Sequence, residues 1–276
     1  MKKFLSALGA FLSRFYMIII FIFLYAPIIL LMVFSFNEGR STSVFTGFSL
    51  RWYVELFHDS QIMDALYYTV LTAVVSSLVA AVVGTISAIG ISRLKGWQRN
   101  SMVNVANLPI INPDILTGVS LMLLFILMKM PLGLGTMMIA HITFNIPYVI
   151  LSVLPHMRQM DPHLYEAAMD LGASPSQAFF KVIIPELMPG IISGTLLAFT
   201  MSIDDFIISF FTTGNGISNL SIVVYSMAKR GIKPSINALS TIMFLTVLIL
   251  LVVVNLIGKS GRKAKKPSRQ PVRSLI

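Results

Sequence analysis

DPHLYEAAMDLGASPSQAFFKVIIPELMPG, residues Asp161–Gly190, is a polar segment enclosed between two long apolar runs. Asp161 is a suitable N-cap, and Pro162 suits the first helical position, where a missing N–H costs nothing. Gly172 then supplies the left-handed residue with which many helices end. The sequence therefore predicts a short helix before this glycine, and its apolar residues at helical spacing are Leu164, Ala167, Ala168 and Leu171.

A second short helix is predicted directly after the glycine. Ser174, with Gln177 three residues later, has the pattern of a capping box, and Pro175 lies at the first helical position. Pro185 is expected to end this helix, and Pro189 marks the next boundary. The two helix signals together indicate a folded connection rather than a flexible linker.

The same residues have the spacing of a known motif. Glu166-Ala167-Ala168 is followed by Gly172 and then by Val182-Ile183-Ile184-Pro185, which resembles the EAA loop of ABC importer permeases. In that family the loop docks into a cleft of a cytoplasmic ATPase subunit. The alternative is a pair of amphipathic helices lying on the bilayer, which an acidic pair four residues apart disfavours. The resemblance implies a coupling loop over residues 161–188 with the ATPase-coupling positions Glu166, Ala167, Ala168, Asp170, Gly172 and Pro185.

The composition is that of a membrane protein. The chain is 56% hydrophobic and 12% charged, against about 25% charged for an ordinary soluble domain. Its longest apolar runs reach the roughly twenty residues that span a bilayer as a helix. We therefore predict an all-α polytopic protein, with one transmembrane domain over residues 1–258 and a basic tail over 259–276. Its six predicted transmembrane helices cover residues 15–36, 66–92, 101–128, 130–155, 189–213 and 234–258.

The distribution of Lys and Arg predicts the orientation. An even number of spans places both termini on one side, and assigning them to the cytoplasm puts 15 cations inside and 6 outside. Lys229, Arg230 and Lys233 go against this rule, and they can belong to a half-inserted helix near Ile222–Arg230. The basic tail follows a span directly, so we expect it to meet anionic lipid headgroups rather than nucleic acid.

Several kinds of enzyme site are missing from the sequence. There is no G-x-x-x-x-G-K-[ST] phosphate loop, no cysteine, and no H-E-x-x-H or G-x-S-x-G pattern. The histidines are scattered without ligand spacing. His141 lies within a predicted span, where it either lines a cavity or bonds to a neighbouring helix. We therefore expect no enzyme activity, metal or cofactor in this chain, and any ATP and Mg²⁺ to be bound by a partner.

Two adjacent carboxylates lie within the fifth predicted span. Each ionisable group at such a depth costs about 2.5–3.5 kcal/mol on insertion scales. On a continuous helix, Asp204 and Asp205 point about 100° apart. One is expected to line a pathway for a cation while the other meets a neighbouring helix. In the alternative interpretation, the pair is neutralised by Lys229, Arg230 or a partner subunit.

Asp114 is the second anomaly. It follows Asn112-Pro113 in the third span, with Pro109 just upstream, so we expect this span to be kinked or broken. Broken helices are common where a transporter binds its cargo. Asp114 either contacts the substrate or caps the second half of the helix.

Further runs of sequence restrict the resemblance to one branch of the ABC importer permeases. They resemble the permease subunits of spermidine/putrescine ABC importers, the PotC type, over nearly the whole chain except its basic tail. The runs are Phe48–Tyr53, Asn112–Ile115, His141–Phe144, Ser202–Asp205 and Tyr225–Met227.

The resemblance implies the MetI-like fold of a type I importer in a bacterial inner membrane, a second permease subunit, a cytoplasmic ATPase dimer and an external polyamine-binding protein. A polyamine pathway needs spaced carboxylates with aromatic walls between them. The alternatives are a permease for another small cationic solute and a stand-alone proton-coupled carrier or channel. The candidate pathway residues are Asp204, Asp205, Asp114, Phe206, Phe210 and Tyr225.

Overall fold

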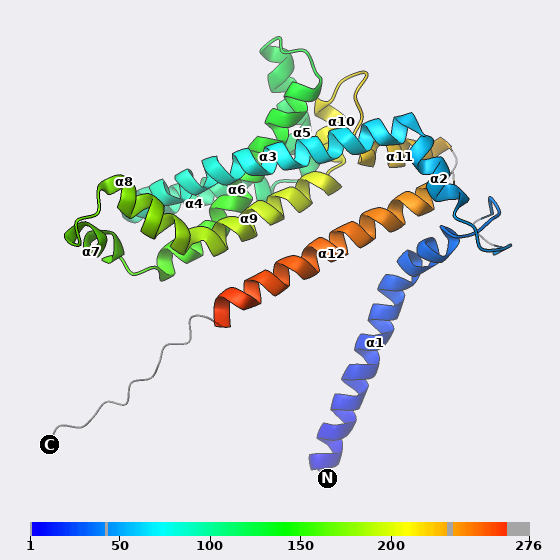
Figure 1. The fold of residues 1–276 in the computed structure, drawn as a ribbon, viewed down its shortest axis with the longest axis horizontal. Coiled ribbons are helices and arrows are strands. Elements are labelled where there is room, and N and C mark those ends of the chain that lie inside the picture. Colours follow the sequence, from blue (N-terminus) through cyan, green and yellow to red (C-terminus); the bar gives the residue numbers. More distant parts are fainter. Residues whose placement is uncertain (1, 42–43, 231–233, 264–276) are drawn as a thin grey trace. The chain divides into compact units, whose positions relative to one another are not determined.

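The computed structural model describes residues 2–41, 44–230 and 234–263, and every regular element in these ranges is a helix (Figure 1). The all-α prediction is therefore confirmed for this part of the chain. The chain divides into two units, one formed by residues 1–59 and 229–276 and the other by residues 60–228. From residue 264 onward, the predicted basic tail lies outside the described residues.

The first unit contains α1 (Lys2–Phe34), α2 (Arg51–His58) and α12 (Ser235–Lys263), and α12 packs against both of the others. Residues Phe15–Phe34 of α1 contain an 18-residue stretch with a mean hydropathy of 3.0, and none of its residues is buried. Such a helix requires an apolar surrounding for its side chains, which a bilayer supplies.

The loop between α1 and α2 is organised by one buried asparagine. The Nδ2 atom of Asn37 donates to the carbonyls of Ser41 and Val44, and its Oδ1 accepts from the Thr46 amide. The Trp52 indole in turn donates to the Asn37 carbonyl over 2.6 Å. These bonds fold the loop back onto the start of α2.

Three long helices form the centre of the second unit. They are α3 (Ser60–Arg93), α6 (Leu134–Gln159) and α9 (Ile184–Asp204), which pack against one another. Figure 1 shows them running lengthwise, with α7 and α8 at one end and α10 and α11 toward the other. Their contact is close because small residues recur every four positions on the buried face of α9, namely Gly190, Gly194, Ala198 and Ser202.

Glycine is required where α9 crosses α6. A Cβ atom added to Gly194 would lie 3.0 Å from both the Val149 Cα and the Ser152 Cβ. On α3, a Cβ added to Gly84 would lie 2.7 Å from the Val149 Cβ. Val149 of α6 therefore sits between two backbones that approach it without an intervening side chain.

The third predicted span is broken, as the sequence predicts. It consists of α4 (Gly96–Ile111) and α5 (Asp114–Leu127), whose axes differ by 102°. Asn112 and Pro113 between them have extended backbone. Pro113 has no N–H to continue the helix and disfavours helical backbone at the preceding residue.

The connection between α6 and α9 confirms some of the predicted signals and corrects others. α7 (Leu164–Asp170) begins later than expected, with His163 rather than Asp161 at its N-cap. Gly172 has φ +85° and is left-handed as predicted. The capping box at the start of α8 (Pro175–Ala178) is also present, with bonds between Ser174 and Gln177 in both directions.

The prediction that Pro185 ends the second short helix is wrong. A π-helical turn, η1 (Phe179–Ile183), follows α8 and leads directly into α9. In this wider turn the Ile184 amide bonds to the Phe179 carbonyl, five residues back. Pro185 directly follows this turn, and Pro189, predicted to mark a boundary, lies inside α9. Neither proline ends a helix, so the second short helix and the fifth span form one continuous element from Pro175 to Asp204.

The fifth predicted span is not continuous through Thr213. α9 ends at Asp204, Asp205 has extended backbone, and α10 (Ile207–Thr212) follows. A helix, α11 (Leu220–Arg230), is present where the half-inserted helix was predicted, and its insertion depth stays a prediction. Of the basic cluster near it, Lys233 lies outside the described residues.

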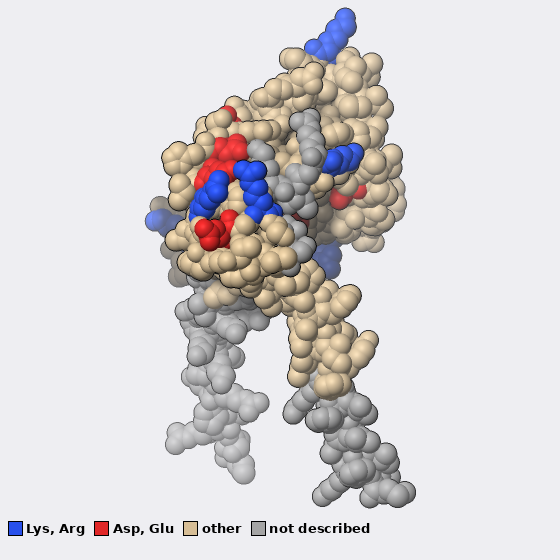
Figure 2. Space-filling model, turned by 90° about the vertical axis from the view of Figure 1, so that its right-hand side faces the viewer, with Lys and Arg blue, Asp and Glu red and all other residues tan. Residues whose placement is uncertain are grey.

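Among the described residues, four helices are long and apolar enough to cross a membrane, and the bent α4–α5 pair makes a fifth if it is one span. The described apolar part of α12, Ser235–Ile249, is shorter. The total of six spans thus remains a prediction. On the face shown in Figure 2, charged side chains occupy a small part of the described surface, as expected for a polytopic membrane protein.

Candidate functional site

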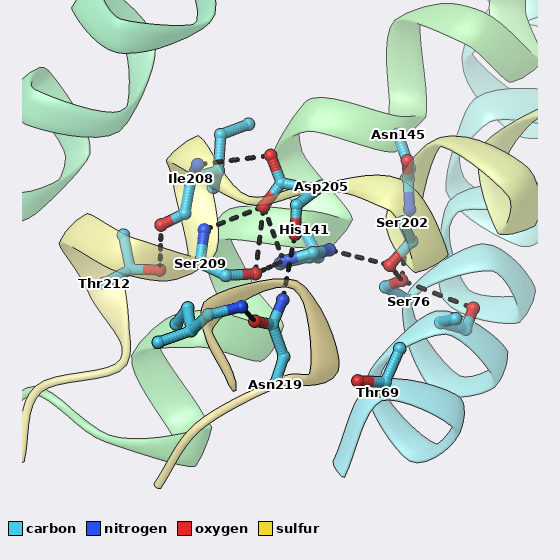
Figure 3. Close-up of polar contacts among 12 residues, drawn as sticks. Thr69, Ser76, His141, Asn145, Ser202, Asp205, Ile208, Ser209, Thr212 and Asn219 are labelled. Atoms are coloured by element: carbon cyan, nitrogen blue, oxygen red, sulfur yellow. Dashed lines mark hydrogen bonds and ion pairs between the residues drawn. The ribbon is translucent and has the colours of Figure 1, made fainter. Parts of the chain in front are cut away.

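The Asp205 carboxylate lies at the break between α9 and α10. Its side chain is 7% exposed, and it accepts hydrogen bonds from the Ile208 amide at 3.1 Å and the Ser209 amide at 2.7 Å (Figure 3). The Ser209 hydroxyl donates to it as well, over 2.9 Å. Asp205 therefore caps the N-terminus of α10, and satisfying these amides stabilises the interruption.

The imidazole of His141 connects the two sides of this break. It comes from α6 and is 1% exposed. Its Nδ1 atom lies 2.7 Å from the Ser202 hydroxyl, in the last turn of α9. Its Nε2 atom lies 2.9 Å from the Ser209 hydroxyl in α10 and 3.4 Å from the Asp205 carboxylate. His141 is thus bonded to neighbouring helices, one of the two interpretations left open by the sequence.

The bonded network continues into α3 and α6. The hydroxyls of Ser202 and Ser76 lie 3.2 Å apart, and the Asn145 side-chain amide donates to Ser76 over 3.0 Å. Asn145 and His141 are four residues apart on α6 and therefore share a face. One buried group of polar side chains thus crosses from α3 through α6 to the break in the fifth span, as Figure 3 shows.

The beginning of α11 is tied to the same place. The Asn219 side-chain amide donates to the Asp205 carbonyl over 2.9 Å, and its oxygen accepts from the Ile222 amide. The Leu220 amide donates to the Thr69 hydroxyl of α3 over 2.8 Å. The position of α11 is therefore fixed relative to both the break and α3.

Asp204 has a different environment from its neighbour. It is the last residue of α9 and is exposed, while Phe206 follows just beyond the break. The Phe206 ring centroid lies 4.5 Å from that of Tyr225 and 5.4 Å from that of Phe210. Tyr225 is 41% exposed and Phe210 50% exposed. The structure thus brings the three predicted aromatic residues together, with Phe206 two residues after the exposed carboxylate.

Asp114 lies on a different helix from Asp204 and from the cap residue Asp205. It is exposed at the first position of α5, a helix that packs against α10. The cap residue of α5 is Pro113, which makes no side-chain cap bond. A carboxylate in the first turn still interacts favourably with the positive end of the helix dipole.

The connection between α6 and α8, residues 160–174, contains the predicted coupling residues other than Pro185 and is called the knob below. Glu166, Ala167 and Asp170 are exposed on α7, whereas Ala168 is buried. The His163 Nδ1 atom lies 3.3 Å from the Glu166 carboxylate. Leu171, predicted on the apolar face of this helix, is instead 89% exposed just after it.

Most of the buried polar network was not predicted from the sequence. Ser76, Asn145, Ser209 and Asn219 were not singled out, and Ser202 entered only as part of a run that carries the family resemblance. A signal was present in the form of polar residues on otherwise apolar helices, with His141 and Asn145 four positions apart. Such groups rarely face lipid and usually find partners inside the bundle.

The fold resembles those of bacterial ABC importer permeases. A bacterial ABC transporter involved in alginate import has a TM-score of 0.69 at 13% identity, covering 92% of this chain and 96% of the other. The MetNI methionine ABC transporter has a TM-score of 0.56 at 18% identity, covering 75% and 97%.

Residues 80–263 match the family described as binding-protein-dependent transport system inner membrane component, and the chain belongs to this family. It is 39% identical over 229 residues to the putrescine transport system permease protein PotI of Escherichia coli (strain K12), covering 80% of this chain and 82% of the relative. It is 35% identical over 251 residues to the spermidine/putrescine transport system permease protein PotC of Haemophilus influenzae, covering 91% and 98%. The chain is thus a multi-pass inner-membrane permease.

Proposed function

We propose that this chain forms half of the membrane pathway of an ABC importer for polyamines. The observation that carries the proposal is the exposed Asp204 carboxylate at the end of α9, two residues before Phe206, whose ring contacts those of Phe210 and Tyr225. A polyamine alternates ammonium groups with methylene segments. A carboxylate replaces the hydration of an ammonium group, and an aromatic face attracts the cation and covers the methylenes. The relatives named for putrescine and spermidine transport support this cargo.

The knob around α7 supplies the proposed connection to the motor. Its exposed residues Glu166, Asp170 and Leu171 suit a cleft on a cytoplasmic ATPase. The left-handed Gly172 and the capped start at Ser174 give it a fixed shape. Because the helix from Pro175 runs to Asp204, a displacement of the knob would be transmitted to the end of the helix that bears this carboxylate.

The other subunits of the proposed importer supply the functions that this chain lacks. ATP and Mg²⁺ belong to an ATPase dimer, a second homologous permease completes the pathway, and an external binding protein delivers the cargo. Both termini and the Asp161–Gly190 connection face the cytoplasm in this scheme, because that orientation places most Lys and Arg inside. Closure of the ATPase dimer on ATP would drive alternating access.

The test is uptake by the reconstituted importer, with its ATPase, second permease and binding protein in proteoliposomes. Asp204→Asn removes the proposed cation ligand without changing side-chain size. We expect uptake of spermidine or putrescine at limiting concentration to fall by about tenfold or more, equivalent to about 1.4 kcal/mol of lost interaction.

Asp64→Asn is the matched control. Asp64 is an exposed carboxylate near the start of α3 and takes no part in the contacts described at the break, so its neutralisation should leave uptake unchanged. Equal uptake by the wild type and the Asp204→Asn importer would contradict the assignment of this carboxylate to the pathway.

A further inference from the structure

The hydrogen bonds of the buried network at the break have a common direction from donor to acceptor. This direction follows from the number of protons that each group carries. Ser209 has one hydroxyl proton, and it is donated to the Asp205 carboxylate. The Ser209 oxygen must then accept at its contact with His141, so Nε2 carries a proton. In a neutral imidazole, Nδ1 is consequently the acceptor, and the Ser202 hydroxyl donates to it.

The same reasoning continues to the far end. Ser202 has used its proton, so at the 3.2 Å contact between the two serines Ser76 is the donor, and its one hydroxyl proton is shared with the longer, 3.4 Å contact to the Ala73 carbonyl. The Ser76 oxygen accepts from the Asn145 amide. Every bond from Asn145 to Asp205 thus points the same way, and such chains polarise and strengthen one another. The carboxylate is the single final acceptor of this chain.

We propose that His141 is the positioning residue for the cargo-binding carboxylate. With Ser202 on one side of the break and Ser209 and Asp205 on the other, its imidazole fixes the end of α9 relative to the start of α10. Asp204 and Phe206 flank the intervening Asp205, so this clamp determines where they lie. The role assigned to Asp204 rests on the proposed function, whereas the clamp itself is defined by the contacts of His141.

Removal of the imidazole has a local consequence. The Ser202 and Ser209 hydroxyls lose their shared partner, and no other side chain in these contacts reaches both of them. Asp205 still caps α10 through the amides of Ile208 and Ser209. The two helices are therefore expected to persist while the angle between them becomes free to change.

The chain contains no cysteine, so a single introduced thiol reports position without background from this subunit. In the assembled importer, Asp204→Cys is modified with a small cationic methanethiosulfonate, and its rate is measured by mass spectrometry of this chain. We expect His141→Ala to change that rate by about fivefold or more, a typical coupling between contacting residues.

Met201→Cys is the matched reporter. Met201 is exposed on α9 before the break, so its labelling rate should be the same with and without His141. A changed rate at position 204 alone supports the clamp. Unchanged rates at both positions, or equal changes at both, overturn it, because a general loosening would affect both thiols.

A second pair of variants covers the case in which His141→Ala does not assemble. Ser202→Ala removes the contact on the α9 side, and Ser87→Ala removes an exposed hydroxyl that bonds only within α3. We expect the first to change the rate at Asp204→Cys and the second not to. No difference between them would overturn the proposal.

Uptake kinetics separate this inference from the proposed function. If His141 acts by positioning, His141→Gln should raise the KM for polyamine about tenfold and leave the maximal rate of ATP hydrolysis unchanged. If the maximal rate of ATP hydrolysis fell by as large a factor as KM rose, the role of His141 would be merely structural and the proposal would be overturned. If Asp204→Asn leaves uptake unchanged, the pathway assignment fails, while the labelling result still decides the clamp.

Discussion

Asp204 and Asp205 are adjacent in the sequence but have opposite surroundings. Asp205 is 7% exposed and accepts three hydrogen bonds, whereas Asp204 is exposed. The first stabilises the fold and the second is accessible to a solute. A carboxylate buried in a membrane protein therefore has to be assigned from its partners and not from its depth alone.

This difference predicts distinct effects on stability. Asp205→Ala removes the cap of α10 and leaves amides of Ile208 and Ser209 unpaired, which should cost about 1–3 kcal/mol. Asp204→Ala should cost little. The measurement is the unfolding temperature of the purified complex in detergent, and equal temperatures for the two variants would contradict the assignment.

Gly172 is a residue whose backbone determines the shape of the knob. Its φ of +85° is strained for a side chain with a Cβ, by roughly 1–2 kcal/mol. Gly172→Val should therefore distort the proposed contact with the ATPase and separate ATP hydrolysis from uptake. The ratio of solute taken up to ATP hydrolysed should fall, with membrane insertion intact.

The control for that variant is Gly90→Val. Gly90 is exposed on α3, and a Cβ there would meet nothing within 4 Å. Gly172→Asn should be intermediate, because asparagine tolerates the left-handed region better than valine. Normal coupling in Gly172→Val would show that the knob does not transmit work.

At the scale of elements, the α6–α9 contact depends on missing side chains. Gly194→Leu would force atoms into the Val149 backbone and the Ser152 side chain, and overpacking of this kind costs about 1–3 kcal/mol. We expect a lower unfolding temperature and faster proteolysis of the solubilised chain. Gly135→Ala, at a site with nothing within 4 Å of the added Cβ, should leave both unchanged.

The elements that sequence patterns predicted correctly are those controlled by nearby residues. The left-handed Gly172 and the Ser174–Gln177 capping box depend on groups within a few positions of each other. The broken third span follows equally from Pro113, which cannot donate a backbone hydrogen bond.

The errors arose where distant contacts or an alternative helix geometry intervened. The break at Asp205 is bridged by His141, which lies 61 positions from Ser202 in the sequence. Pro185 was expected to end a helix because a regular α-helix disfavours proline in its interior. The π turn before it removes that conflict, and a local pattern gives no indication of such a turn.

At the scale of the whole molecule, the orientation in the membrane is directly testable. The absence of cysteine allows Ser176→Cys, in the α6–α9 connection, to be compared with Asn215→Cys, between α10 and α11; both native residues are exposed. In intact spheroplasts, a membrane-impermeant maleimide should label Asn215→Cys. It should label Ser176→Cys only after permeabilisation, and the reverse pattern would invert the proposed topology.

The exposed apolar side chains in and near the knob have a consequence for the lifetime of unassembled copies of the chain. Leu171 is 89% exposed, and Phe180, nearby in the sequence, is 68% exposed. A copy of the chain without its partner subunit therefore presents exposed apolar side chains, which chaperones and proteases recognise. Under the proposed function an ATPase subunit covers these side chains, so chains made in excess of that subunit would keep them exposed. Surplus copies would be short-lived, and supply of the motor would set how many importers accumulate.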